Sequence, residues 1–197
     1  MNKNRLEAFS DGVLAIIITI MILEIKVPKG SGFMDLYPLY PKFISYVLSF
    51  IYVGIYWNNH HHLLQSLTKV NGRILWANLH LLFWLSLIPV STGWLGEHHF
   101  AKAPVTLYGI ILFMSAIGFK ILQSVIISSE GKKSLLATAV GKDSKGRVSQ
   151  LLYLAAIFIS FFNEWIAISI YFIVAIIWLI PDTRIEKILI KKEKESI

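Results

Sequence analysis

The chain has 197 residues, of which 55% are hydrophobic and 16% are charged, and its net charge is +7. A soluble domain has about 25% charged residues and about 45–50% apolar ones. The apolar excess lies in long blocks separated by short basic segments, which excludes a soluble globular enzyme, a disordered chain and a disulfide scaffold. The position of the basic residues between these blocks favours membrane-orienting charge over a nucleic-acid-binding face. The sequence contains no cysteine, so disulfides and thiolate metal sites are excluded as well. This pattern predicts an all-α membrane protein.

About 20 apolar residues are needed for a helix to cross a bilayer core about 30 Å thick. Five apolar stretches cover residues 6–25, 39–64, 74–95, 105–128 and 148–180. The last is too long for one ordinary span, and Asn163 and Glu164 interrupt it near its middle. We therefore predict a tight hairpin of two short spans, 148–163 and 165–180, and a single six-helix channel domain. One tilted helix with a buried Glu164 is the alternative.

The Lys and Arg residues predict how the chain is oriented. Of the 19, 14 lie in the N-terminal segment, the second-to-third and fourth-to-fifth connections and the tail, and four lie on the alternate side. Cytoplasmic segments carry the excess of Lys and Arg, so both termini are expected in the cytoplasm. Residues 181–197 then form a basic cytoplasmic tail, expected to rest on the inner leaflet. An even number of spans agrees with this topology.

The first span is unusual because its strictly apolar core covers only residues 12–23. Twelve helical residues span about 18 Å, so Ser10, Asp11 and Glu24 are expected at or near membrane depth. A helix with such polar ends is more stable inside a bundle than in lipid. Alternatively, Asp11 complements the N-terminal dipole of a peripheral helix.

A set of side chains recurs at helical spacing on one face of this span: Ile16, Thr19, Ile20 and Leu23. Because the whole helix is apolar, periodicity alone does not decide whether this face packs or lines a pore. Glu24 follows Leu23 directly at the end of this span, and it either attracts cations or pairs with Lys26.

Three motifs occur in order along the first three spans. Residues 5–11 read RLEAFSD, the end of the second span carries Trp57, Asn59, His60 and His61, and the third carries Trp76, Asn78 and Pro89. These match the R-x-x-x-F-S-D, W-x-N-H-H and LLW-x-N…L-x-P patterns of the transmembrane protein 175 family. The chain therefore resembles the endosomal and lysosomal potassium channels of animals and their bacterial homologues.

The resemblance implies six helices per repeat and, for a chain with one repeat, a bacterial homotetramer in the inner membrane. Its four first helices would line a central pore. Ile16 would form the hydrophobic constriction, Ile20 and Leu23 further apolar layers, and Thr19 a hydroxyl layer. The implied function is a potassium-preferring cation leak channel without cofactors, with proton permeation as a further expectation.

The resemblance also implies a polar network that holds the pore helices in register. Its expected members are Arg5, Phe9, Ser10, Asp11, Trp57, Asn59, His60, His61 and Asn78. Phe9 would act as a wedge against neighbouring helices and Arg5 would offset Asp11. The spacing leaves open which histidine faces Asp11, because adjacent helical residues point about 100° apart.

Other functions are less well supported by the sequence. Three consecutive histidines, His60, His61 and His62, cannot converge on one metal ion from a helix. No pattern typical of a catalytic triad or a phosphate-binding loop occurs, so we predict no enzyme. A proton-coupled transporter, in which Asp11 and the histidines titrate, is the alternative function, and a non-conducting scaffold is a third.

Overall fold

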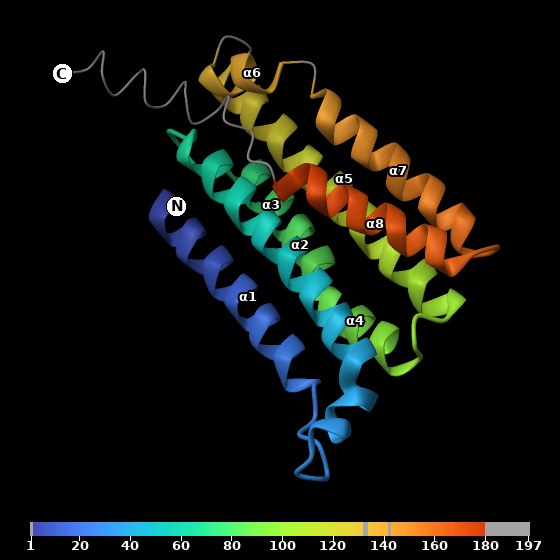
Figure 1. The fold of residues 1–197 in the computed structure, drawn as a ribbon. Coiled ribbons are helices and arrows are strands. Elements are labelled where there is room, and N and C mark those ends of the chain that lie inside the picture. Colours follow the sequence, from blue (N-terminus) through green and yellow to red (C-terminus); the bar gives the residue numbers. More distant parts are fainter. Residues whose placement is uncertain (1, 132–133, 142, 180–197) are drawn as a thin grey trace.

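The computed structural model describes residues 2–131, 134–141 and 143–179. Its helices are α1 (Lys3–Leu23), the short 3-10 helix η1 (Phe33–Leu39), α2 (Tyr40–Gln65), α3 (Gly72–Ser86), α4 (Ile88–Glu97), α5 (Lys102–Glu130), α6 (Leu135–Val140), α7 (Ser144–Ser160) and α8 (Glu164–Leu179). The chain is an all-helical bundle (Figure 1). The predicted basic tail, 181–197, lies outside the described residues.

Within the described ranges, four helical segments are long and apolar enough to cross a membrane: α1, η1 with α2, α3 with α4, and α5. The predicted hairpin is present as two helices, because the chain reverses at residues 161–163 between α7 and α8. Asn163 caps α8 through its side-chain oxygen, which accepts from the backbone N–H groups of Trp165 and Ile166. The single tilted helix is therefore wrong for this stretch.

The predicted third span is a helix with a break. The structure has α3 and α4 in its place, separated at Leu87. Pro89 explains the break, because proline lacks a backbone N–H and its ring clashes with the carbonyl group four residues earlier. The two helices still form one apolar path, Gly72–Glu97.

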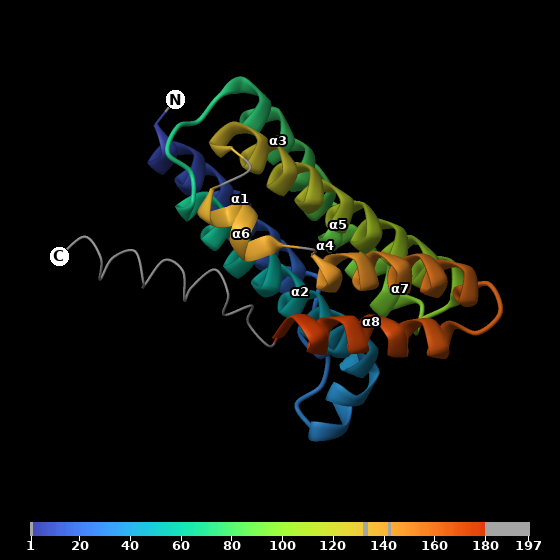
Figure 2. The ribbon, with the colours of Figure 1, turned by 90° about the horizontal axis from the view of Figure 1, so that it is seen from above.

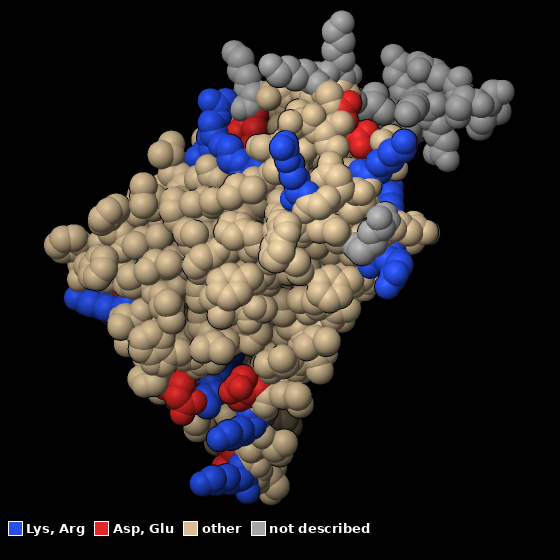
Figure 3. Space-filling view, turned by 180° about the vertical axis from the view of Figure 1, so that it is seen from behind, with Lys and Arg blue, Asp and Glu red and all other residues tan. Residues whose placement is uncertain are grey.

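The helices pack in a fixed lateral order. The α1 helix lies against α2, α3 and α4, whereas α7 packs on α5 and α8. Consequently α1 and the α7–α8 hairpin lie on opposite sides of the bundle (Figures 1 and 2). The start of α1, the α2–α3 connection and α6 share one end, and η1 and the start of α5 lie at the other (Figure 1). Seen from behind, charged side chains gather at these two ends and leave a broad uncharged surface between them (Figure 3).

Close helix packing depends on two glycines of α5. A methyl group on Gly109 would overlap the hydroxyl of Tyr171 in α8, and one on Gly118 would lie 3.1 Å from Cα of Leu81 in α3. These positions let α5 approach its neighbours on both sides. At the opposite end from the N-terminus, Lys42 of α2 forms an ion pair with Glu97 of α4.

Candidate functional site

The α1 helix has two distinct faces in the folded chain. One face is buried in the bundle and carries Leu6, Ser10, Leu14, Ile17 and Met21. The opposite face is exposed and carries the four candidate pore residues: Ile16 (59% exposed), Thr19, Ile20 and Leu23 (74%). The bundle therefore packs against one stripe of α1 and leaves the predicted stripe exposed among the residues that the structure describes.

The Thr19 hydroxyl is oriented by its own helix. Its Oγ1 donates a hydrogen bond to the backbone carbonyl of Ala15, at 2.9 Å. This pattern is common for Thr in apolar helices and uses the single hydroxyl proton. The oxygen lone pairs remain free to accept on the exposed face, so Thr19 can offer an oxygen to a cation.

A buried chain of side chains ties α1 to α2 and α3. The fully buried Ser10 Oγ donates to the carbonyl of Leu6 at 2.9 Å and accepts from Asn78 Nδ2 at 3.0 Å. The Asn78 Oδ1 atom lies 2.7 Å from Nε2 of His60. With the amide in this orientation, His60 must carry its proton on Nε2 to donate to Asn78. These hydrogen bonds link α1, α2 and α3 through the side chain of Asn78.

Asp11 belongs to a second, exposed branch. Its Oδ1 accepts from the indole N–H of Trp57 at 3.1 Å. The Trp57 ring stacks on His61, with ring centroids 6.3 Å apart, and His61 Nε2 lies 2.8 Å from Nε2 of Gln65. The two histidines therefore serve different branches, and within the described chain neither forms a hydrogen bond with Asp11.

Two expected members lie apart from this network. Among the described residues, Arg5 forms no ion pair or side-chain hydrogen bond with Asp11. The Asn59 amide donates to the Ile55 carbonyl of its own helix at 2.8 Å and faces a cavity on the other side of α2. Motif membership therefore did not predict which side of the helix each side chain occupies.

Glu24 is exposed at the end of α1. Its carboxylate packs against Gly93 of α4 and lines a small cavity with Lys42 and Glu97. In the part of the chain that the structure describes, it forms no ion pair with Lys26. The Lys42–Glu97 pair was missed because only the fold brings these two residues together.

The described residues contain no group of three or more His, Asp or Glu side chains that could hold a metal ion. The fold and the exposed stripe of α1 therefore define a helical membrane protein. Its first helix has an apolar face that is exposed among the described residues.

Comparison with known proteins gives the class and the family. Residues 5–89 match the family described as endosomal/lysosomal potassium channel TMEM175. A potassium channel of Chryseobacterium sp. (strain P1-3) is 62% identical over 187 residues, which cover 95% of this chain and 97% of that protein. The chain belongs to the TMEM175 family of potassium channels.

Two other relatives show how far the likeness extends. The crystal structure of a lysosomal potassium-selective channel TMEM175 homologue from Chamaesiphon minutus superimposes with a TM-score of 0.80 at 28% identity, covering 91% of this chain and 97% of that one. The endosomal/lysosomal proton channel TMEM175 of Gallus gallus is 33% identical over 103 residues, or 46% of this chain and 21% of that protein.

Proposed function

We propose that four copies of this chain form a potassium-preferring cation leak channel in the bacterial inner membrane, with the four α1 helices around a central pore. The observation that carries the proposal is the exposed stripe of α1, because its apolar side chains are left uncovered by the described part of the subunit. Family membership supports an ion channel rather than an enzyme.

In the proposed pore, Ile16 forms the narrowest apolar ring and Ile20 and Leu23 form further layers. Such a constriction excludes water, so ions pass only when the side chains move apart. Thr19 lies between these layers and presents a hydroxyl oxygen that replaces part of the hydration shell of an ion. Since K⁺ loses its water more easily than Na⁺, a partial preference for K⁺ follows.

The proposed tetramer is supported by motif side chains that point away from the subunit. Phe9 is 52% exposed and Trp76 is 75% exposed, and the Asp11–Trp57 hydrogen bond is also exposed. Large aromatic side chains at such positions are typical of helix interfaces or of lipid contact. In the proposed assembly they contact the neighbouring subunit and fix the angle of α1.

The proposed topology has six crossings with both termini in the cytoplasm. The α7 and α8 helices have 17 and 16 residues, so each is about 24–26 Å long and fits a locally thinned bilayer. The Lys and Arg distribution supports the orientation.

Protons are a second proposed permeant ion, because the animal relatives are named proton channels. A proton-coupled transporter is the competing function, and the interrupted α3–α4 path is the feature that resembles the broken helices of transporters. A channel passes current in proportion to the driving force, whereas a coupled transporter requires its second substrate.

The test is K⁺ and Na⁺ flux through the purified protein in liposomes, compared with that of Ile16→Asn. The polar side chain should wet the constriction and increase K⁺ flux. Ile176→Asn provides a matched control, because Ile176 of α8 is equally exposed (58%) but lies on the far side of the bundle. Equal fluxes for the wild type and Ile16→Asn would remove Ile16 from the gate, and no flux in either would overturn the channel.

A further inference from the structure

We propose that each subunit contains a proton route of its own, through the bundle interior and separate from the α1 stripe. The route is a relay of three buried hydroxyls, Tyr108, Ser49 and Thr92, between two small cavities whose linings include polar side chains. The inference rests on the proposed permeation of protons. The proposed K⁺ flux through the central pore does not depend on it.

The three hydroxyls come from three helices and touch in sequence. Ser49 Oγ of α2 lies 3.0 Å from the Tyr108 hydroxyl of α5 and 2.7 Å from Thr92 Oγ1 of α4. All three side chains are buried, with exposures of 0 to 4%. The relay therefore crosses the interior where no lipid or solvent reaches it.

The directions of these hydrogen bonds follow from one fixed contact. Thr92 Oγ1 donates to the Ile88 carbonyl at 2.7 Å, and its other possible acceptors among the described residues are Ser49 Oγ at 2.7 Å and Met21 Sδ at 3.9 Å. Since a hydroxyl has one proton, Ser49 must then donate to Thr92 and Tyr108 to Ser49. The three O–H groups are thus aligned head to tail, and hydrogen bonds aligned in this way strengthen one another.

The Thr92 end of the relay opens into a cavity of about 20 Å³. Its lining includes the carboxylates of Glu24 and Glu97 and the ammonium group of Lys42. This volume and these polar groups suit one water molecule. Once the Thr92 hydroxyl turns from the Ile88 carbonyl to that water, its proton can reach a carboxylate at the outer end of the bundle.

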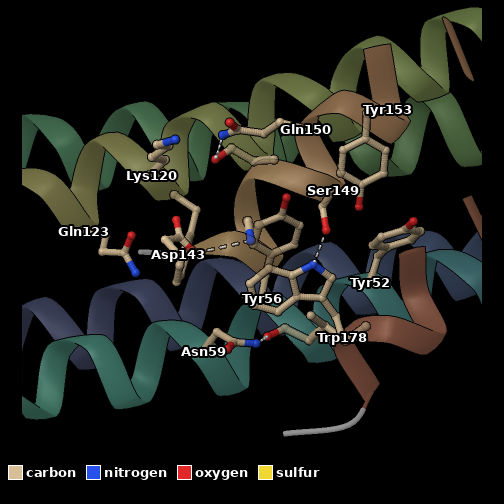
Figure 4. Close-up of a pocket in the computed structure, with 14 residues that line it drawn as sticks. Tyr52, Tyr56, Asn59, Lys120, Gln123, Asp143, Ser149, Gln150, Tyr153 and Trp178 are labelled. Carbon is tan, nitrogen blue, oxygen red and sulfur yellow. Dashed lines mark hydrogen bonds between the residues drawn. The ribbon is translucent and has the colours of Figure 1, made fainter. Parts of the chain in front are cut away.

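At the other end, a cavity of about 50 Å³ lies between α2, α5, α7 and α8 (Figure 4). Tyr52, Tyr56, Tyr153 and Ser149 form its inner part, and Asp143 lies toward the end that carries α6 (Figure 4). The hydroxyl and amide groups that line it suit water. Asp143 can therefore exchange a proton with the inner cavity.

Tyr52 connects this cavity to the relay. Its ring packs edge-to-face on Tyr108, with centroids 6.4 Å apart at 70°, while its hydroxyl donates to the Tyr171 carbonyl at 2.6 Å. Among the described residues, no hydrogen bond joins Tyr52 to Tyr108. A turn of the Tyr52 hydroxyl or one water molecule must complete this step, so it sets the rate and keeps the route a slow leak.

The transfer balances without any co-reactant. A proton arriving at the Tyr108 oxygen releases the proton of Tyr108 to Ser49 and that of Ser49 to Thr92. The Thr92 hydroxyl turns its own proton from the Ile88 carbonyl to the outer cavity water and releases it there. Each oxygen again holds one proton, no charge remains, and the hydroxyls must turn back before the next transfer. K⁺ cannot follow, because the three oxygens are in direct contact.

The experiment uses vesicles of phosphatidylcholine and phosphatidylglycerol that contain the full chain, K⁺ and an entrapped pH dye. Dilution into K⁺-free buffer makes the interior negative as K⁺ leaves. Acidification before a protonophore is added measures proton entry through the protein, and acidification after it measures K⁺ flux. Tyr108→Phe and Ser49→Ala should each lower proton entry at least about tenfold, with K⁺ flux unchanged.

Tyr171→Phe is the matched control, because it also removes a buried tyrosine hydroxyl, one that donates to the Val105 carbonyl outside the relay. It should leave both fluxes unchanged. Proton entry in Tyr108→Phe and Ser49→Ala equal to that of the wild type would overturn the relay, as would wild-type vesicles that pass K⁺ but no protons. Parallel loss of both fluxes would show that the hydroxyls are only structural. In the first two cases the K⁺ channel itself would stand.

Discussion

Asn78 of α3 donates a hydrogen bond to the fully buried hydroxyl of Ser10, 3.0 Å away in α1. The same amide accepts from His60 of α2 at 2.7 Å, so one side chain satisfies buried polar groups from both neighbouring helices. The position of α1, and with it the position of its exposed stripe, is therefore coupled to α2 and α3 at this point.

Asn78→Ala should destabilise the folded subunit, because it leaves the buried His60 N–H without an acceptor. Such a group costs about 1–3 kcal/mol. The melting temperature in detergent should fall by about 2–4 °C per kcal/mol. His60→Ala should cost a similar amount, and the double variant should lose less than the sum because both changes break one interaction.

Asn59→Ala is the control for this prediction, since among the described residues the Asn59 amide forms its hydrogen bond within its own helix. It should lower the melting temperature less than Asn78→Ala. Strict additivity of Asn78→Ala and His60→Ala would mean that the contact contributes nothing to stability.

Asp11→Ala should weaken assembly more than folding of the subunit. The Asp11–Trp57 hydrogen bond is exposed in the single chain, so its loss leaves little buried polar surface within the subunit. If the branch is covered by a neighbouring subunit, the variant should shift from tetramer to smaller species at low protein concentration. Size-exclusion chromatography with light scattering measures this shift, and an unchanged tetramer would contradict the role in assembly.

Sequence patterns predicted the helical class and the apolar stretches. They left open whether the stripe of α1 packs in the bundle or lines a pore, because the whole helix is apolar. The break between α3 and α4 was missed because Pro89 lies inside a stretch whose hydropathy is continuous. The hydropathy pattern predicts which residues lie in an apolar environment. It does not distinguish one straight helix from two consecutive helices that share one apolar path.

Side-chain partners were less predictable. The motif grouped Arg5 and Asn59 with Asp11, but the fold places Asn59 on another side of α2 and leaves Arg5 unpaired with Asp11 in the described chain. Ser49, Thr92 and Tyr108 carry no motif at all. Their contact depends on the crossing of α2, α4 and α5, which no local pattern encodes.

Gly109→Ala should destabilise the packing of α8 on α5. A methyl group there would overlap the Tyr171 hydroxyl, which donates to the Val105 carbonyl at 3.2 Å. Overpacking of this kind costs about 1–3 kcal/mol. Gly54→Ala is the control, because a methyl group on Gly54 meets nothing within 4 Å. Thermal unfolding should show a loss for Gly109→Ala only, and Gly109→Ala with Tyr171→Phe should recover part of it.

Thr19→Val should reduce the preference for K⁺ over Na⁺ without closing the pore. The change keeps the shape of the side chain and removes the oxygen that Thr19 presents on the exposed face of α1, where its proton is already committed to Ala15. Without that oxygen, neither ion recovers part of its hydration shell at this layer, so total flux should fall and the K⁺/Na⁺ flux ratio should approach one. Thr19→Ser retains a hydroxyl and should keep the ratio of the wild type. Liposome flux with K⁺ and Na⁺ gradients in turn measures both quantities, and a K⁺ preference that survives in Thr19→Val would assign selectivity to another layer of the pore.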